Sequence, residues 1–262
     1  MTFKIIVCIK QVPDTNDIKW TEHNTIQRDG LDSILNPYDI SAIQFANNFK
    51  YVLEDVKITV VSMGPTQAKD ALKEAIAIGA DEAYLLSDKK FSAADTLATA
   101  YTLSQFIKSK FPDFNIILCG QQAIDGDTAQ TPSSLAEKLD IPQITNVVWS
   151  KEISLESSIW TRITNNERED VKITHPALIA VSNTELDIIP NINGYINAHN
   201  CDITVLNADD IDASPEKIGL KGSPTLVKKA YCPNITRKNE STIADSTDDA
   251  AKIIMNEINN CR

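Results

Sequence analysis

The stretch CGQQAIDGDTAQT at residues 119–131 follows an apolar run, NIILCG, and surrounds two glycines with glutamines, aspartates and threonines. Gly120 and Gly126 allow the backbone to approach a ligand closely. The residues placed where a helix N-terminus would present N–H groups are Thr128, Gln130 and Thr131. This pattern predicts a cradle for the phosphate of a nucleotide. The alternative is an ordinary Asp/Gly loop, because two aspartates disfavour a bare anion unless they face ribose hydroxyls or cap the helix.

Three other segments with unusual chemistry stand at predicted strand ends or helix starts. They are CIKQVPDT from Cys8, LNPYD at 35–39 and SMGP at 62–65. In an open parallel sheet, ligands bind outside the carboxyl ends of the strands. We therefore expect these segments to lie near the predicted cradle.

The common catalytic and nucleotide-binding motifs are absent from the sequence. No G-x-G-x-x-G follows a strand, no P-loop is present, and no G-x-S-x-G accompanies the three histidines, so hydrolase chemistry is not expected. The five cysteines are Cys8, Cys119, Cys201, Cys232 and Cys261, and the histidines are His23, His175 and His199. Their spacing predicts neither a disulfide framework nor a metal site.

Composition narrows the possible partners and location. The chain has 262 residues, of which 42% are hydrophobic, and carries a formal net charge of -11. Such a charge repels nucleic acid and anionic lipid. The first apolar run is too short for a signal peptide, and no segment resembles a membrane span. The sequence therefore predicts a cytoplasmic protein without nucleic-acid binding or membrane insertion.

Strand-like and helix-like segments alternate in the first half of the chain. The predicted strands are 3–9, 56–62, 82–87 and 115–120, and the predicted helices are 37–55, 65–79 and 94–110. This βαβ series predicts an α/β fold with a doubly wound, mostly parallel, Rossmann-like sheet of the kind that binds adenine nucleotides. Asn36 is expected to cap the helix that Pro37 begins, and Gly79 to end the next helix.

The pattern changes after about residue 145. Period-two alternation over 145–182, interrupted by the polar turn TNNERED, predicts an antiparallel addition to the same sheet, and 183–203 is expected to form a loop and a short helix. We predict an α/β nucleotide-binding domain over 1–208. The remaining residues, 209–262, are expected to form an arm and a final helix at 245–260 that pack on a partner subunit.

Five motifs together resemble the beta subunit of electron-transfer flavoprotein. They are VCIKQVPDT, LNPYD, VSMGPTQA at 61–68, AIGADEAYLLSD at 77–88 and the cradle stretch, in the family's order and spacing. The resemblance covers roughly residues 1–235, and five ordered motifs make chance agreement implausible. It implies a heterodimer with a larger alpha subunit and an adenine nucleotide at the strand ends.

The resemblance also implies which residues contact the nucleotide. The matching positions are Cys8, Asn36, Pro37, Tyr38, Asp39, Met63, Gly120, Gln121, Gln122, Ala123, Ile124, Asp125, Gly126, Asp127, Thr128, Ala129, Gln130 and Thr131. Conventional members bind AMP, whereas electron-bifurcating members bind a second FAD. The stretch at 87–103 and the arm GLKGSPTLVKK at 219–229 resemble the bifurcating, anaerobe type. This similarity favours FAD and adds Phe91, Asp95, Thr96 and Thr99 as cofactor contacts.

Three functions remain open on the sequence. The favoured one is the beta subunit of a bifurcating flavoprotein, which with its alpha subunit would pass electrons from NADH to a low-potential acceptor such as ferredoxin and to a flavin dehydrogenase. The alternatives are a conventional AMP-containing carrier serving acyl-CoA dehydrogenases and a stand-alone adenine-nucleotide-binding regulatory protein. In the electron-transfer functions the bound cofactor carries the redox chemistry, and no side chain of this chain is expected to be catalytic.

One segment departs from the family pattern. The family loop that docks the dehydrogenase usually contains Asn-Glu-Pro-Arg-Tyr, whereas this chain has NTELDIIPNINGY at 183–195. Docking is still expected near Ile189–Tyr195, with Ile189 or Ile192 as the apolar anchor. The alternative is a diverged surface loop. Met63 is equally consistent with a flavin contact and with packing, Cys8 is expected to be buried, and Trp20, Trp149 and Trp160 are expected to fill core or interface.

Overall fold

The computed structural model describes residues 2–14, 33–165, 167–182, 184, 188–227 and 243–260. The chain divides into two compact units, Met1–Lys228 and Lys229–Arg262. The first unit therefore also includes residues 209–228, which the sequence analysis assigned to the arm. In the second unit, helix α6 (Thr247–Asn260) lies where the final helix was expected. The contact of the arm and of this helix with a partner subunit stays a prediction.

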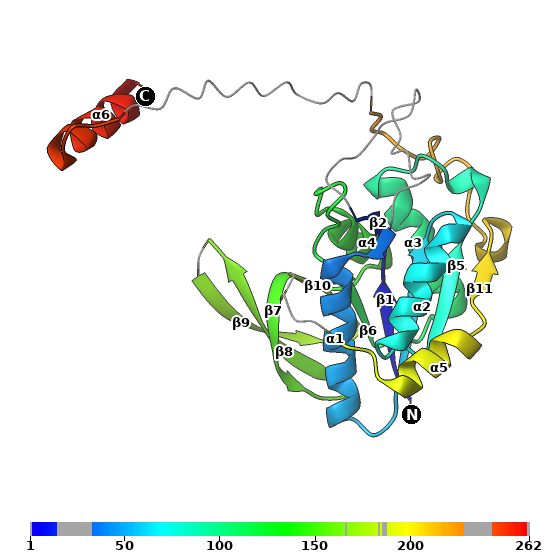
Figure 1. Cartoon of the computed structure of the whole chain (residues 1–262). Coiled ribbons are helices and arrows are strands. Elements are labelled where there is room, and N and C mark those ends of the chain that lie inside the picture. The colour runs from blue at the N-terminus through cyan, green and yellow to red at the C-terminus, as the bar shows by residue number, and fades with distance from the viewer. Residues whose placement is uncertain are drawn as a thin grey trace. The chain divides into compact units, whose positions relative to one another are not determined.

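A nine-stranded sheet forms the centre of the first unit (Figure 1). Its strands are β1 (Phe3–Cys8), β4 (Val56–Met63), β5 (Glu82–Leu86), β6 (Ile116–Gly120), β7 (Gln143–Ile153), β8 (Ser157–Thr164), β9 (Glu167–Thr174), β10 (Ala177–Val181) and β11 (Thr204–Leu206). The order across the sheet is β11-β5-β4-β1-β6-β10-β7-β8-β9. Pairing is parallel from β11 to β7 and antiparallel from β7 to β9.

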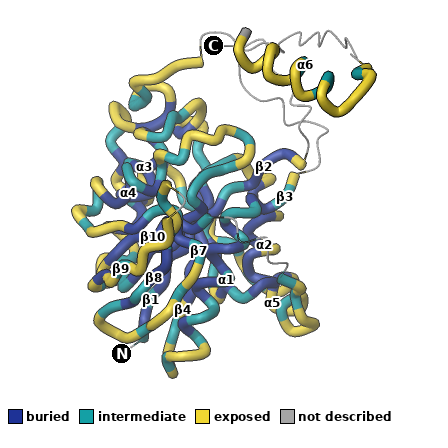
Figure 2. The backbone as a smooth tube through the Cα atoms, turned by 90° about the vertical axis from the view of Figure 1, so that its left-hand side faces the viewer, coloured by how far each residue is buried: buried dark blue, intermediate teal, exposed yellow. Residues whose placement is uncertain are grey.

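Helices cover both faces of the parallel part of the sheet. On one face lie α1 (Pro37–Val52), α2 (Lys69–Ala77) and α5 (Ile192–Asn200), and on the other lie α3 (Thr96–Lys110) and α4 (Thr131–Leu139). Short 3-10 turns are η1 (Thr66–Ala68), η2 (Lys89–Phe91) and η3 (Asp209–Ile211). Alternate β1 side chains enter the two cores, with Ile5 on the α1 side and Ile6 on the α3 side. The doubly wound α/β fold is thereby confirmed, and Figure 2 shows its central strands as the most buried part.

Two strands of the nine-stranded sheet differ from the sequence expectation. The predicted antiparallel addition holds for β7, β8 and β9, but β10 returns to the parallel sheet and lies between β6 and β7. Its five residues are all buried, which fits a central strand better than an edge. Strand β11 at the other edge was not predicted, because TVL is too short to show a period.

The helix ends show how local sequence is used. Asn36 stands at the N-cap position of α1, but its side chain makes no capping hydrogen bond, so this part of the expectation was wrong. Gly79 follows α2 with φ of +127°, a conformation that L residues rarely adopt, and α2 ends there as predicted. The side chain of Asn36 instead forms hydrogen bonds with the loop after β6.

Candidate functional site

Three distant segments meet at the carboxyl ends of β1 and β6. Cys8 of β1 lies beside Cys119 of β6 in parallel register. After β1 the chain forms β2 (Gln11–Pro13), which pairs with β3 (Ser33–Leu35) and brings the LNPYD motif back to the strand ends. There the backbone N–H of Asn36 donates to the carbonyl of Lys10 at 3.0 Å. The structure thus unites the end of β1, the start of α1 and the loop after β6.

Asp39, in the first turn of α1, ties the two strand ends together. Its Oδ2 accepts a hydrogen bond from the Lys10 N–H at 2.7 Å, and its Oδ1 accepts one from the Gly120 N–H at 3.1 Å. The side chain is only 4% exposed. Burial raises the pKa of this carboxyl to about 7, although hydrogen bonds from Lys10, Asn36 and Gly120 oppose the rise. Asp39 is therefore a structural tie that changes its charge near neutral pH.

Asn36 holds the loop after β6 from the same side. Its Nδ2 donates to the carbonyl of Gln122 at 2.9 Å, and its Oδ1 accepts from the N–H of Ile124 at 3.3 Å. The residue is 1% exposed, so these partners satisfy polar groups that water does not reach. This double contact explains why the side chain does not cap α1.

The two aspartates of the loop make contacts within the protein. Lys10 forms an ion pair with Asp125 at 2.6 Å, and the Asp125 side chain is 3% exposed. Gln122 donates from Nε2 to Asp127 Oδ1 at 3.0 Å and to the Tyr38 hydroxyl at 3.3 Å. The ion pair with Lys10 offsets the negative charge of Asp125, so at this residue the objection that an aspartate would repel a phosphate is weaker. Lys10 was not among the predicted site residues, although it lies inside the CIKQ motif.

The two glycines of the loop have different surroundings. A Cβ added to Gly120 would lie 2.2 Å from Asp39 Oδ1 and 2.7 Å from Tyr38 Cβ, so the loop packs directly on α1 there. A Cβ added to Gly126 would meet nothing within 4 Å. Beyond it, Asp127 and Ala129 have φ of 47° and 52°. Gly120 therefore serves internal packing, whereas Gly126 leaves exposed backbone open to a ligand.

The N-terminus of α4 follows this loop directly. Gln130 stands at the N-cap but makes no side-chain cap. Its Oε1 instead accepts from the Thr96 hydroxyl at 3.4 Å, which places the starts of α3 and α4 side by side. Pro132 has no N–H and the Ser134 N–H donates to the Gln130 carbonyl, so the first turn of α4 can offer an anion the N–H groups of Thr131 and Ser133. Gln121 does not join this surface, since its Oε1 accepts from the N–H of Asn146 at 2.8 Å.

The second group of predicted contacts lies at the start of α3. Asp95 caps the helix by accepting from the N–H groups of Leu97 and Ala98, each at 3.0 Å. Its other oxygen accepts from the N–H and the hydroxyl of Thr225, at 3.1 and 2.8 Å. The carboxylate therefore holds the segment after η3 against this loop, a partnership that the sequence analysis missed.

The other predicted residues near α3 vary in exposure. Phe91 is 5% exposed and packs in the core on the α3 side. Met63 is partly buried against the same core, and Thr99 is partly exposed on α3. Of the tryptophans, Trp160 is fully buried, Trp149 is exposed, and Trp20 lies outside the described residues.

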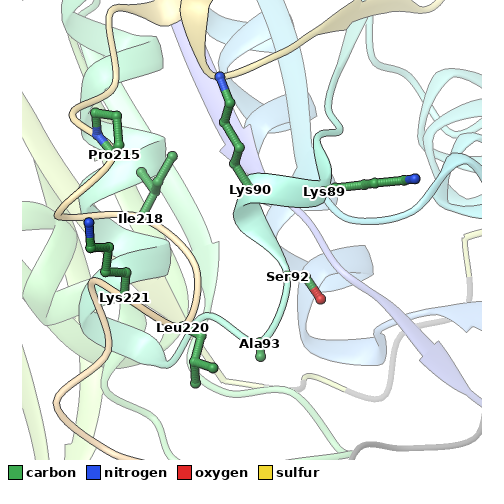
Figure 3. Close-up of a pocket in the computed structure, with 8 residues that line it drawn as sticks. All are labelled: Lys89, Lys90, Ser92, Ala93, Pro215, Ile218, Leu220 and Lys221. Carbon is green, nitrogen blue, oxygen red and sulfur yellow. The ribbon is translucent and has the colours of Figure 1, made fainter.

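A depression of about 410 Å³ lies between residues 89–93 and 215–221. Figure 3 shows the side chains that line it. Its lysines do not converge, since Lys89 points away from Lys90 and Lys221. Lys90 pairs with Asp209, and Lys221 pairs with Glu216. The depression is therefore a shallow, largely apolar hollow beside α3 and not a phosphate site.

The helix α5 and the residues before it expose large apolar side chains. These are Ile189, Ile192, Tyr195 and Ile196. Ile189 is 87% and Ile192 is 79% exposed, which agrees with the use of this segment as a surface. Residues 183 and 185–187 of the altered family loop lie outside the described residues.

The described part of the chain holds neither a membrane-spanning helix nor a metal site. None of its helices is both long and apolar enough to cross a membrane. Among the same residues, no group of three or more His, Cys, Asp or Glu side chains could hold a metal ion.

Comparison with known proteins identifies the class to which this fold and site belong. The family model described as "Electron transfer flavoprotein domain" matches residues 23–211. The chain is 45% identical over 239 residues to the electron transfer flavoprotein subunit beta of Thermoanaerobacterium thermosaccharolyticum, which covers 90% of each protein. It is 42% identical to the protein of the same name from Megasphaera elsdenii, over 97% of this chain and 96% of the other.

A third relative is named for a larger complex. The caffeyl-CoA reductase-Etf complex subunit CarD of Acetobacterium woodii is 37% identical to this chain and covers 97% of each protein. The chain therefore belongs to the electron transfer flavoprotein beta-subunit family, as its five motifs predicted. Membership implies an alpha subunit as its partner.

Proposed function

We propose that this chain is the FAD-binding beta subunit of an electron-bifurcating electron transfer flavoprotein. The observation that supports nucleotide binding most strongly is the cradle itself, in which Asn36 and Asp39 fix the loop after β6 and leave Gly126 exposed. When bound, a flavin supplies the electron transfer. The residues of this chain bind and orient it and do not act as acid, base or nucleophile.

Several features of the cradle suit a nucleotide. The open start of α4 can face a phosphate, and the ion pair between Lys10 and Asp125 keeps a carboxylate from opposing it. Asp127 and Tyr38 present polar atoms beside the same loop through Gln122. The arrangement therefore offers backbone N–H groups for phosphate and polar side chains for hydroxyl groups.

The preference for FAD over AMP rests on similarity. Residues 87–103 resemble the bifurcating type, and the relative CarD is named as a subunit of a reductase-Etf complex. One observation favours the alternative with AMP. Asp95, expected beside a second flavin, already uses both carboxylate oxygens on α3 and Thr225. The conventional carrier therefore stays the second candidate.

In the favoured function the heterodimer takes electrons from NADH and divides them between a low-potential acceptor such as ferredoxin and a flavin dehydrogenase. The dehydrogenase would dock on the apolar surface around Ile189–Tyr195. A stand-alone regulatory role is less favoured, since the family implies an alpha subunit. The cytoplasmic location rests on the sequence alone and stays a prediction.

Cofactor content tests this proposal directly. The chain is produced together with its alpha subunit, the complex is denatured, and released nucleotides are separated and counted per heterodimer. Two FAD would support the bifurcating assignment. One FAD with one AMP would move the chain to the conventional carriers, and a single FAD with no second nucleotide would contradict the cradle.

A further inference from the structure

Two cysteines lie side by side in the floor of the cradle. Cys8 ends β1 and Cys119 precedes the last residue of β6, and the two are direct partners across these parallel strands. Both are free thiols, and they are 8% and 5% exposed. Both belong to the core cluster on the α3 side, so their side chains point to the same face of the sheet.

The register places this pair within reach of a disulfide bond. Neighbouring strands run about 4.8 Å apart, so directly opposed Cα atoms fall near that separation. Disulfides join Cα atoms roughly 4.4–6.8 Å apart. The two thiols also interact, since the Cys8 thiol is the largest cause that raises the pKa of Cys119. No large backbone movement is therefore needed to join them.

We propose that Cys8 and Cys119 form an oxidisable dithiol, a site at which peroxide produces a reversible disulfide in the floor of the cradle. The neighbouring residues fit this role, because the ends of both strands are already held together. Asp39 bonds the N–H of Lys10, two residues after Cys8, and the N–H of Gly120, next to Cys119. The tie keeps the two sulfur atoms in register while they react.

The reaction balances with one peroxide per pair. A thiolate attacks a peroxide oxygen, so that an S–O bond forms, the O–O bond breaks and one water leaves after protonation. The second thiol then attacks this sulfenic sulfur, the S–S bond forms, the S–O bond breaks and a second water leaves. Two thiols lose two electrons and the peroxide gains them.

The environment indicates which thiol reacts first. The pKa of Cys119 is raised well above its ordinary value by interaction with the Cys8 thiol, by burial and by the charge of Asp39. Cys8, the slightly more exposed of the two thiols, is assigned as the attacking thiol, and Cys119 as the one that resolves the sulfenic acid.

A bound nucleotide should protect the pair. This part rests on the proposed function, because it assumes that the ligand lies over the ends of β1 and β6. Peroxide reaches thiols according to their exposure, so a ligand on the cradle should slow disulfide formation by about tenfold. Oxidation would then report whether the cradle is occupied.

Tryptic mapping of the oxidised complex tests the dithiol. The chain with its alpha subunit is treated with hydrogen peroxide, unfolded in N-ethylmaleimide near neutral pH so that remaining thiols are blocked, and digested with trypsin. Cys8 lies in the peptide 5–10 and Cys119 in the peptide 111–138. We expect these two peptides to be linked after peroxide and released by dithiothreitol. Separately alkylated peptides, at a peroxide dose that oxidises Cys201, would overturn the proposal.

Matched variants provide the controls. Cys8→Ala and Cys119→Ala should each abolish the linked peptide, whereas Cys201→Ala should leave its yield unchanged. Two variants of the pair are used so that a folding defect in one does not decide the test. Sulfinic acid on Cys8 without any linked peptide would also overturn the proposal.

The protection arm separates this proposal from the proposed function. The complex, freed of exchangeable nucleotide by gel filtration, is oxidised with added FAD, with added AMP and with neither. Slower linking with either nucleotide supports both proposals. Linking at the same rate in all three samples would leave the dithiol established and contradict nucleotide binding at the cradle.

Discussion

The cradle buries polar side chains, whereas the surface around α5 exposes apolar ones. In the cradle, the polar residues Asn36 and Asp39 are 1% and 4% exposed. Around α5, the apolar residues Ile189 and Ile192 are 87% and 79% exposed. A buried polar group costs free energy unless it is hydrogen-bonded, and exposed apolar area costs roughly 25 cal/mol per Å². The chain solves the first problem by itself, whereas the proposed docking of a partner would solve the second.

This difference indicates what each region does. The cradle is preformed, since the hydrogen bonds of Asn36 and Asp39 described above all join parts of this chain. A ligand there meets a preformed surface. The surface around α5 is different, because its exposed apolar side chains would be stabilised if another surface covered them. Changes to the buried contacts of the cradle should therefore affect folding, and changes around α5 should affect association.

The largest effect is expected for Asp39→Ala. This change leaves the N–H groups of Lys10 and Gly120 without their buried acceptor. Loss of two such hydrogen bonds should lower the free energy of unfolding by about 3 kcal/mol or more. Urea unfolding of the heterodimer followed by circular dichroism measures this. Glu137→Ala, on the exposed face of α4, serves as the control, and equal losses in both variants would break the comparison.

A pH effect should accompany this tie. The pKa of Asp39 is raised from 3.8 to about 7 in the folded chain, so the folded state binds more protons than the unfolded state between those values. Its contribution to stability is fully present below pH 3.8 and is lost as the pH rises toward 7. The free energy of unfolding should fall across this window, on the order of 3–4 kcal/mol from Asp39 alone.

The measurement compares unfolding of the wild type and Asp39→Asn at pH 5 and pH 7.5. The variant loses one acceptor and is less stable throughout, but its stability should change less between the two pH values. Other carboxyls titrate in both proteins and cancel in the difference. If the two pH dependences coincide, the buried carboxyl of Asp39 does not titrate in this range.

Gly120 and Gly126 form a natural pair for testing the cradle. Gly120→Ala brings a Cβ to 2.2 Å from Asp39 Oδ1, so the loop must move off α1. Overpacking of this kind should lower stability by about 1–3 kcal/mol and also weaken nucleotide binding. Gly126→Val meets no protein atom near its Cβ, so its fold should survive while nucleotide occupancy is lost.

Nucleotide content and thermal unfolding of the two glycine variants give the readout. Full occupancy in Gly126→Val would show that the exposed backbone at this position does not face the ligand. Unchanged stability in Gly120→Ala would mean that the contact between the loop and α1 is looser than the structure shows.

Local sequence predicted the fold well where the signal was local. The apolar runs at β1, β4, β5 and β6 mark buried parallel strands, and the alternation at β7 to β9 marks an antiparallel hairpin region. The parallel placement of β10 could not be read locally, since its short apolar run suits a strand of either direction. Such a choice depends on which strands lie beside it.

The candidate site was predictable in its location but not in its contacts. The cradle loop, LNPYD and CIKQ were recognised as motifs, yet Asn36 was expected to cap a helix because Asn before Pro is a common helix start. The ion pair of Lys10 with Asp125 and the bond of Asp95 to Thr225 join residues 115 and 130 positions apart. Such partners follow from tertiary packing and leave no local pattern.

The smallest effect on the protein itself is expected from the double change Ile189→Ala with Ile192→Ala. Both side chains are mostly exposed, so the free energy of unfolding should stay within about 0.5 kcal/mol of the wild-type value. Flavin content should be unchanged within experimental error. Transfer to the dehydrogenase should weaken by about 1–2 kcal/mol of apparent affinity, because truncated apolar anchors no longer fill a partner pocket. Steady-state transfer measured against dehydrogenase concentration shows this as a higher half-saturation.

The matched control for this surface is Tyr51→Ala, an 86% exposed side chain near the end of α1. It removes similar apolar area from a different place and should leave half-saturation unchanged. If the double variant and the control behave alike, the residues around α5 do not dock the dehydrogenase. Their exposure would then require no partner, since apolar side chains scattered singly on a surface are common. The contrast between the two regions would rest on the contacts of Asp39 and Gly120 in the cradle alone.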